Sequence, residues 1–388
     1  MRNKPRIRFK GFTEDWEQRK LSDILKVNSG KDYKHLDQGN IPVYGTGGYM
    51  LSVNESLSNI DAIGIGRKGT IDKPQYLKAP FWTVDTLFYL TALDKHSILF
   101  LYYLMQLIPW KKFDESTGVP SLSKTTIDNI SGFVPSNSQE EELISALFNQ
   151  LDKSITLHQR KLEKLKLAKK ALLQKLFPKN GSQFPEIRFK GFTDAWEQRK
   201  LISLYKTIRN AFVGTATPYY TNDSINGYFY LESNNVKNGK INRNNEIYIT
   251  KDFYQKQEDK LLYKDDIVIV QSGHVGHTAV IPEELDKTAA HALIMLQNKK
   301  ENFDSHFINN SFQTPLIRNK IDEITTGNTI KHILASDVKT IVINMPSFKE
   351  QKLISQLFKL LDLNITLHQR KLERLQEVKI GLLQKMFV

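Results

Sequence analysis

The sequence contains no cysteine and no long apolar run, and both absences limit what the chain can be. Without cysteine there is no disulfide framework and no cysteine-ligated zinc. The longest apolar stretch, residues 98–108, is interrupted by Gln106, and a membrane-spanning helix needs about 20 apolar residues. The N-terminus, MRNKPRIRFKGF, lacks the apolar core of a signal peptide. We therefore expect a cytoplasmic protein with no membrane partner.

Acidic residues are outnumbered. The chain has 55 Lys and Arg against 42 Asp and Glu, a net charge of +13. Such an excess favours a polyanionic partner, most simply nucleic acid, because phosphate neutralisation releases counterions. A basic surface kept for solubility is the alternative. A membrane surface fits less well, since the basic residues are spread along the whole chain.

Catalytic signatures are missing as well. The sequence has no G-x-S-x-G elbow, no Walker A motif, no H-E-x-x-H motif and no Asn/Asp-Pro-Pro-Tyr/Phe methyltransferase motif. His274, His277 and His291 have no carboxylates at matching spacing, so we expect polar or DNA-contacting histidines rather than a metal site. These absences favour a binding protein over an enzyme.

One glycine pattern does resemble a cofactor motif. Gly64, Gly66 and Gly69 in DAIGIGRKGT spell G-x-G-x-x-G, the dinucleotide-binding fingerprint. That fingerprint needs a helix directly after the loop. Here TIDKPQYLKAP follows, with Pro74 and Pro80 and no helical pattern. We interpret the segment as a strand and a tight loop, and expect no cofactor in this chain.

The dominant positive feature is an internal repeat. Residues 7–21, IRFKGFTEDWEQRKL, return as residues 187–201 with 13 of 15 positions identical. Residues 140–177 return as residues 350–387 with 24 of 38 positions identical, including ITLHQRKLE without change. The segments between these copies are much less alike. A constant frame therefore carries two different inserts, as a scaffold presenting two different recognition surfaces would.

The second repeated segment predicts a long helix in each copy. Apolar residues follow steps of three and four with Lys, Arg, Glu and Gln elsewhere, which is typical of a coiled-coil seam. His158 and His368 lie on this seam, where we expect polar residues that fix the register. The other seam positions are Leu143, Leu147, Leu151, Ile155, Leu162, Leu165, Leu172 and Leu176, with counterparts Leu353, Leu357, Leu361, Ile365, Leu372, Leu375, Leu382 and Met386.

Each helix is about 57 Å long at about 1.5 Å per residue and cannot bury its stripe alone. Packing of the two helices on each other is the simplest solution. An antiparallel pair would place one insert at each end, related by a pseudo-two-fold axis. Parallel packing and pairing with another chain are the alternatives. Capping-box signals, Asn137 with Glu140 and Ser347 with Glu350, mark the two helix starts.

The inserts alternate strand-like and helical runs. In the first, DAIGIG (61–66) and TVDTLFYL (83–90) resemble strands, and SILFLYYLMQLI (97–108) resembles a buried helix. In the second, DDIVIVQSG (265–273) resembles a strand and HFINNSFQTPLIRNKIDE (306–323) a helix. We therefore expect each insert to form an α/β globule.

The predicted fold class is α+β, with two α/β domains separated by an antiparallel coiled coil of two long helices. The domain boundaries follow the repeat. We expect domain 1 over residues 1–136, helix 1 over 137–177, a linker over 178–186, domain 2 over 187–346 and helix 2 over 347–388.

Together these segments resemble the specificity subunit of a type I restriction–modification system, over nearly the whole chain. The marks are the two WEQRKL segments, the two ITLHQRKLE…LLQK helices, and the insert motifs IPVYGTGG, IGRKGT, PFWTVDTLFYL and STGVPSLS. The resemblance implies two target-recognition domains, each reading one short half of a split double-stranded DNA target. It also implies that the helices fix the unread gap, and that the chain itself catalyses nothing.

The resemblance further implies partners that carry the chemistry. Two modification subunits would bind S-adenosylmethionine, flip an adenine out of each half-site and methylate it. Restriction subunits would use ATP and Mg²⁺ for translocation and cleavage. Gln159, Arg160, Gln369 and Arg370 on exposed helix faces are candidate contacts with the modification subunits, with a solvated face as the alternative. A standalone bipartite DNA-binding regulator, and an enzyme using a nucleotide at residues 64–69, are the rival functions.

Candidate DNA contacts lie in the glycine loop and in a matching loop after each insert helix. Arg67 and Lys68 are candidates for phosphate or guanine, because the glycines let the backbone approach closely; solvated turn charges are the alternative. STGVPSLSK (116–124) and TTGNTIKHI (325–333) carry small hydroxyl residues and a lysine. The candidate set is Arg67, Lys68, Thr117, Ser121 and Lys124 in the first insert, and Ser272, His274, Asn328 and Lys331 in the second.

Overall fold

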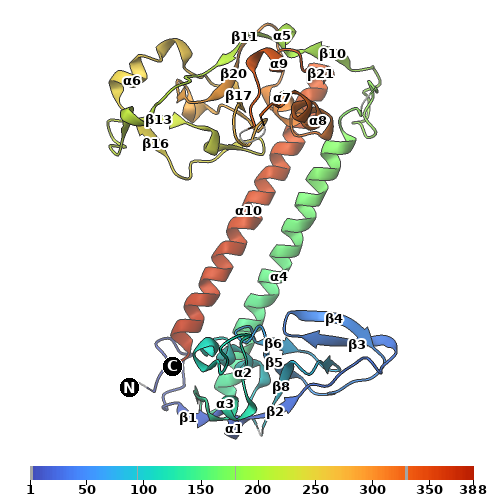
Figure 1. Cartoon of the computed structure of the whole chain (residues 1–388), viewed down its shortest axis with the longest axis vertical. Coiled ribbons are helices and arrows are strands. Elements are labelled where there is room, and N and C mark those ends of the chain that lie inside the picture. The colour runs from blue at the N-terminus through green and yellow to red at the C-terminus, as the bar shows by residue number, and fades with distance from the viewer. Residues whose placement is uncertain (1–2, 94, 180, 328–330) are drawn as a thin grey trace. The chain divides into compact units, whose positions relative to one another are not determined.

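The computed structural model describes residues 3–93, 95–179, 181–327 and 331–388. It contains both helices and sheets, so the α+β prediction is confirmed. The chain divides into two units, the first made of Met1–Lys161 with His368–Val388 and the second of Leu162–Leu367. Two long helices, α4 (Ser138–Lys175) and α10 (Phe348–Met386), each contribute to both units (Figure 1). Each unit therefore holds the start of one long helix and the end of the other.

The first unit is built on an antiparallel sheet with strand order β2-β8-β5-β6, next to a smaller sheet with order β4-β3-β7. A short antiparallel pair, β1 with β9, joins the repeated N-terminal segment to the residues just before α4. The elements are β1 (Glu17–Lys20), α1 (Leu21–Ile24), β2 (Leu25–Ser29), β3 (Gln38–Gly45), β4 (Gly48–Val53), β5 (Ala62–Gly66), β6 (Gln75–Leu77), β7 (Trp82–Thr83), β8 (Leu87–Ala92), α2 (Ile98–Met105), α3 (Lys124–Asn129) and β9 (Ser131–Val134).

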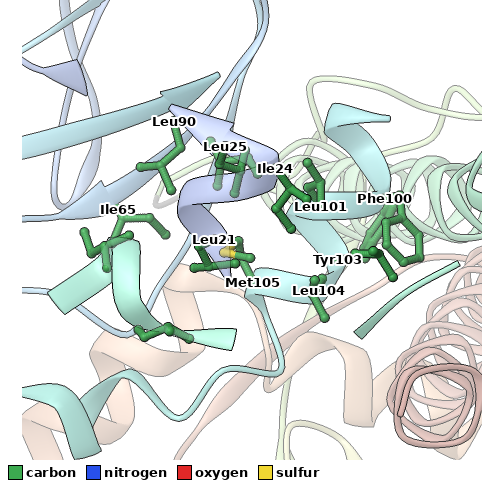
Figure 2. Packing of buried hydrophobic residues seen from close by; sticks show 14 of the residues in the cluster. Leu21, Ile24, Leu25, Ile65, Leu90, Phe100, Leu101, Tyr103, Leu104 and Met105 are labelled. Atoms are coloured by element: carbon green, nitrogen blue, oxygen red, sulfur yellow. The ribbon is translucent and has the colours of Figure 1, made fainter. Parts of the chain in front are cut away.

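The core of the first unit lies around α2, which is apolar along its whole length. Figure 2 shows Leu21 and Ile24 of α1 gathered with Leu101 and Met105 of α2. Phe387, just beyond the end of α10, completes this core. Its ring stacks on that of Phe100, with centroids 5.2 Å apart. The predicted buried helix over 97–108 is therefore present but ends at Met105.

The second unit repeats this plan with additions. Its main sheet has order β11-β20-β17-β18, and a second sheet has order β12-β16-β13-β19. The pair β10–β21 matches β1–β9. The elements are β10 (Glu197–Lys200), α5 (Leu201–Leu204), β11 (Tyr205–Asn210), β12 (Tyr220–Thr221), β13 (Tyr228–Leu231), β14 (Val236–Lys237), β15 (Lys240–Ile241), β16 (Ile247–Ile249), α6 (Lys251–Gln255), β17 (Ile267–Val270), β18 (Thr278–Val280), β19 (Ala289–Ala290), β20 (Leu293–Lys299), α7 (Ser305–Ser311), α8 (Pro315–Ile324), α9 (Ala335–Val338) and β21 (Val342–Met345).

The single helix predicted over 306–323 is wrong, because the structure has two helices there. α7 ends at Ser311 and α8 begins at Pro315. Proline lacks the N–H that a continuous helix needs and pushes the preceding residue out of the helical region. Thr314 is accordingly extended and caps α8, its hydroxyl accepting from the Ile317 N–H.

The two long helices pack antiparallel within each unit. In the first unit the Lys379 ammonium donates to Asp152 at 2.7 Å, and the Nδ1 atoms of His158 and His368 lie 2.7 Å apart. In the second unit the equivalent pair, Lys169 with Asp362, lies at 2.8 Å. The histidine contact requires one Nδ1 to carry a proton and donate a hydrogen bond, which the unprotonated Nδ1 of the other ring accepts.

The predicted seam needs one correction at the start of α4. Leu143 is 44% exposed, whereas Ile144 and Phe148 are buried. The first turns of α4 pack on the core of the first unit, to which the last turns of α10 also contribute, so a different side of the helix is buried there. Ile354 and Phe358 occupy the same positions in α10.

The predicted capping boxes are only half formed. Asn137 accepts the Gln139 N–H at 2.9 Å and Ser347 accepts the Glu350 N–H at 3.4 Å. Glu140 does not close the box; its carboxylate instead accepts two hydrogen bonds from Arg8, at 2.6 and 2.8 Å. Arg188 and Glu350 form the same paired contact in the second unit, at 2.8 Å for both bonds.

The Arg8–Glu140 pair should contribute measurably to the free energy of unfolding. Arg8→Met leaves the fully buried Glu140 carboxylate without its cation, and breaking a buried pair in this way costs about 3–5 kcal/mol. Urea denaturation of the full chain, followed by circular dichroism, measures the loss. Arg19→Met is the matched control, because Arg19 and Glu17 pair while both are half exposed, and such pairs are worth less than about 1 kcal/mol. An equal loss of unfolding free energy in both variants would contradict a special stabilising role for the Arg8–Glu140 pair.

Candidate nucleic-acid interface

The loop after β5 is shaped by glycine. All five residues of β5 are buried. A Cβ on Gly66 would lie 2.1 Å from the Thr70 carbonyl oxygen, and Gly69 has a φ of +94°. Strand β6, not a helix, follows the loop. The glycines thus serve a tight turn, which confirms the interpretation of DAIGIGRKGT as a strand and loop.

This loop is hydrogen-bonded to the loop that precedes α3. The Gly69 N–H donates to the Pro120 carbonyl at 2.8 Å, and the Leu122 N–H donates to the Arg67 carbonyl at 3.0 Å. Between these two hydrogen bonds, Lys68 and Ser121 lie opposite each other as an isolated antiparallel β-bridge. Two segments about 50 residues apart in the sequence therefore form one rigid edge.

Beside this edge lies a concavity of about 400 Å³. The Arg67 guanidinium carbon lies 5.8 Å from the centroid of the Phe88 ring. Thr117 is exposed and lies outside the lining. The structure thus brings together four of the five residues predicted for the first insert. The lining residues are Ser29, Arg67, Lys68, Phe88, Glu115, Ser121, Leu122, Ser123 and Lys124.

Glu115 places a negative charge among these cations. Its carboxylate accepts from the hydroxyls of Thr126 and Ser123. These hydrogen bonds, chiefly the one from Thr126, lower the pKa of Glu115, so it is ionised at neutral pH. The concavity is therefore basic with one fixed carboxylate, which holds the start of α3 in place.

The second unit repeats the paired loops with different side chains. The Gly273 N–H donates to the Lys331 carbonyl at 3.0 Å, and the Ile333 N–H donates to the Gln271 carbonyl at 3.0 Å. Ser272 and His332 form the bridge between them. The second unit therefore has the same platform for a different set of side chains.

The contact pattern fixes which residues are equivalent. Gln271 takes the place of Arg67, Ser272 that of Lys68, and His332 that of Ser121. Ser272 was predicted, but Gln271 and His332 were not. The same hydrogen bonds place Gly273 where Gly69 stands, each two residues after the equivalent positions Gln271 and Arg67. Aligning the two loops STGVPSLSK and TTGNTIKHI would instead set His332 opposite Ser123, so the sequence alone does not locate His332.

The second-unit candidates fall into different settings. Lys331 is exposed. His274 lies with Nε2 2.9 Å from the Ser233 carbonyl oxygen and 3.2 Å from that of Val236, so this nitrogen is occupied within the protein. Asn328 lies outside the described residues.

The other two histidines considered for a metal site, His277 and His291, are also held by protein groups. The Asn238 N–H donates to Nδ1 of His277 at 3.1 Å, and His291 contacts the Glu232 carboxylate at 3.3 Å. Over the described parts of the chain, no group of three or more His, Cys, Asp or Glu side chains is placed to hold a metal ion.

The helix-face candidates for partner contacts are mostly exposed. Gln159, Arg160 and Arg370 are solvent exposed, whereas Gln369 is partly buried and its amide donates to Glu373 at 2.8 Å.

Among the helices of the described ranges, none is both long and apolar enough to cross a membrane.

A family comparison matches both repeats. The type I restriction modification DNA specificity domain matches residues 13–167 and again residues 194–377. The two matches cover most of the chain and follow its internal duplication.

Individual relatives agree with this family match. The type I restriction enzyme MjaVIII specificity subunit of Methanocaldococcus jannaschii is 22% identical, over 94% of this chain and 90% of the relative. The putative type I restriction enzyme MjaX specificity subunit of the same organism is 23% identical, over 94% and 91%.

Solved structures share the fold. The S subunit of a type I restriction–modification system from M. genitalium has a TM-score of 0.71 at 14% identity, over 99% of both chains. A chain solved in work on complex assembly and conformational transition of the type I R-M system gives 0.51 at 12%, over 97% and 98%. At these identities the likeness concerns the fold alone.

His277 should make the stability of the second unit depend on pH. Burial, together with the nearby positive charge of Arg318, lowers its pKa from 6.5 to about 4. Between these values the unfolded chain binds more protons than the folded chain, so the free energy of unfolding should fall as the pH falls from 6.5 to 4. Urea denaturation across this range measures the slope.

His277→Asn keeps an acceptor for the Asn238 N–H. It should reduce the slope of the free energy of unfolding against pH, by an amount that corresponds to the uptake of less than one proton on unfolding. The exposed His306→Asn is the matched control and should leave the slope in place. An unchanged slope in His277→Asn would show that another group titrates.

Proposed function

Because this chain belongs to the type I restriction–modification DNA specificity family, matched over both of its repeats, we propose that it directs a restriction–modification complex to a split DNA target. Each recognition domain, over residues 1–136 and 187–346, reads one half of that target. The chain is non-catalytic, and the methylation and cleavage chemistry belongs to its partners.

The observation that carries this proposal is the duplicated loop platform. The same two backbone hydrogen bonds and the same bridge support Arg67 and Lys68 in one unit and Gln271 and Ser272 in the other. A fixed backbone with exchanged side chains is what two different sequence readers need, since base contacts require defined geometry.

The charge distribution supports a phosphate-bearing ligand at the first platform. Lys68 and Lys124 line the same concavity as Arg67, and both lysines are exposed. We assign Lys68, Lys124, Ser121 and the adjacent Thr117 to contacts with the first half-site. Ser272, His274, Asn328 and Lys331 are assigned to the second.

The long helices are proposed to set the unread gap between the half-sites. In each unit they pack antiparallel, with cross-helix ion pairs at Lys379–Asp152 and Lys169–Asp362. These contacts hold the helices in one register, so helix length becomes a fixed spacer.

The partners are proposed to be two modification subunits and, for cleavage, restriction subunits. Gln159, Arg160, Gln369 and Arg370 supply candidate contacts with the modification subunits. S-adenosylmethionine, ATP and Mg²⁺ would be held by these partner subunits. The site of action is proposed to be the cytoplasm.

Exchanging residues 22–136 for the insert of another family member tests the modular reading. We expect one half of the methylated target to change and the other half, with the gap length, to stay the same. Sequencing of methylated adenines in cells that carry the complete system measures this. Exchange of residues 202–346 is the matched control and should alter the opposite half. Changes in both halves from either exchange would contradict independent readers.

A further inference from the structure

We propose that Arg67 and Gln271 are the base-reading residues at one equivalent position of the two units, Arg67 reading guanine and Gln271 reading adenine. This inference rests on the proposed function and adds the chemical identity of one base in each half-site. It concerns residues whose equivalence is visible only in the folded chain.

The two positions leave the sheet at the same place. β5 pairs with β8 so that Gly66 lies opposite Leu87, and β17 pairs with β20 so that Val270 lies opposite Leu293. Arg67 and Gln271 are the next residues of their chains. The carbonyl of each accepts one hydrogen bond at 3.0 Å, from Leu122 and Ile333 respectively. The side chains of Arg67 and Gln271 therefore start from backbone positions that are held in the same way.

Arg67 has the geometry of a guanine reader. Its N–H donates to the Thr86 carbonyl at 2.8 Å, so both backbone polar groups are fixed. The side chain is exposed, and its guanidinium lies near the Phe88 ring, which limits its orientation. The planar fork of arginine matches O6 and N7 of guanine bidentately.

Gln271 has the chemistry of an adenine reader. Its Oε1 is buried and has no hydrogen-bond partner within the described chain. An unsatisfied buried acceptor is unfavourable, so a rotamer that brings this oxygen to a donor is favoured. Adenine presents the N6 amino donor and the N7 acceptor, which match the carbonyl and amide of glutamine. Gln271 itself is partly exposed, so rotation of its side chain can bring the amide to a base.

The neighbouring residue at each platform provides the contrast. Lys68 is exposed, next to Arg67, and its ammonium is a compact charge suited to phosphate. Its equivalent in the second unit is Ser272, which carries no charge. Loss of Lys68 should therefore weaken binding to all sequences alike, whereas loss of Arg67 should change which sequence is bound.

The test uses the complete restriction–modification complex and sequencing of its methylated adenines. Arg67→Gln should change one position of the first half-site from guanine to adenine, and Gln271→Arg should change one position of the second half-site from adenine to guanine. A lost or gained bidentate pair should shift the preference at that position about 5- to 150-fold. The opposite half-site and the gap stay unchanged in each variant.

Two further variants separate base reading from phosphate binding and from misfolding. Arg67→Ala should leave one position of the first half-site degenerate. Lys68→Ser, the matched control, should lower modification at all targets without changing the sequence. An unchanged target in Arg67→Gln and Arg67→Ala, or loss of all modification by complexes that still assemble, would overturn the assignment. Failure of the unsubstituted complex to methylate any split target would instead refute the proposed function.

Discussion

Neither recognition unit completes its core with its own repeat, and this constraint governs the rest of the structure. Phe177, beyond the end of the first long helix, stacks on Phe307 in the second unit with centroids 5.4 Å apart. Phe387, beyond the end of the second helix, stacks on Phe100 in the first unit. Burying such aromatic rings is worth several kcal/mol, so each helix end is tied to the core begun by the other repeat. Each unit therefore depends on a helix end that the other repeat supplies.

The repeated N-terminal segments lock this exchange. The Ile7 N–H donates to the Lys385 carbonyl, and the Ile187 N–H donates to the Lys175 carbonyl, both at 2.9 Å. The buried Arg8–Glu140 and Arg188–Glu350 pairs hold the same segments to the helix starts. The repeated segments thus stabilise the fold of both units in the same way. The inserts are left to differ in sequence, apart from the loop platform that both retain.

The sequence predicted those features that repeat or recur with a fixed period. The duplication, the two long helices and the presence of a strand and glycine loop at DAIGIGRKGT all follow from local patterns. The partner of Glu140 could not be predicted, because a capping box and a long-range ion pair use the same residue. The equivalence of Gln271 with Arg67 depends on hydrogen bonds between segments about 60 residues apart in the second unit. The prediction for Leu143 was wrong because the first turns of α4 contact a domain core built from several elements, so a two-helix seam does not describe which side is buried.

The proposal that helix length sets the gap is tested most directly by lengthening both helices. A heptad inserted after Arg160 and another after Arg370 keep the seam in phase and add about 10 Å. At about 3.4 Å per base pair, methylation sequencing should show both half-sites unchanged and the gap longer by about three base pairs. The same heptad placed after Gly181, in the linker, should leave the gap as it was. Unchanged gap length with the lengthened helices, or altered half-sites, would contradict the account.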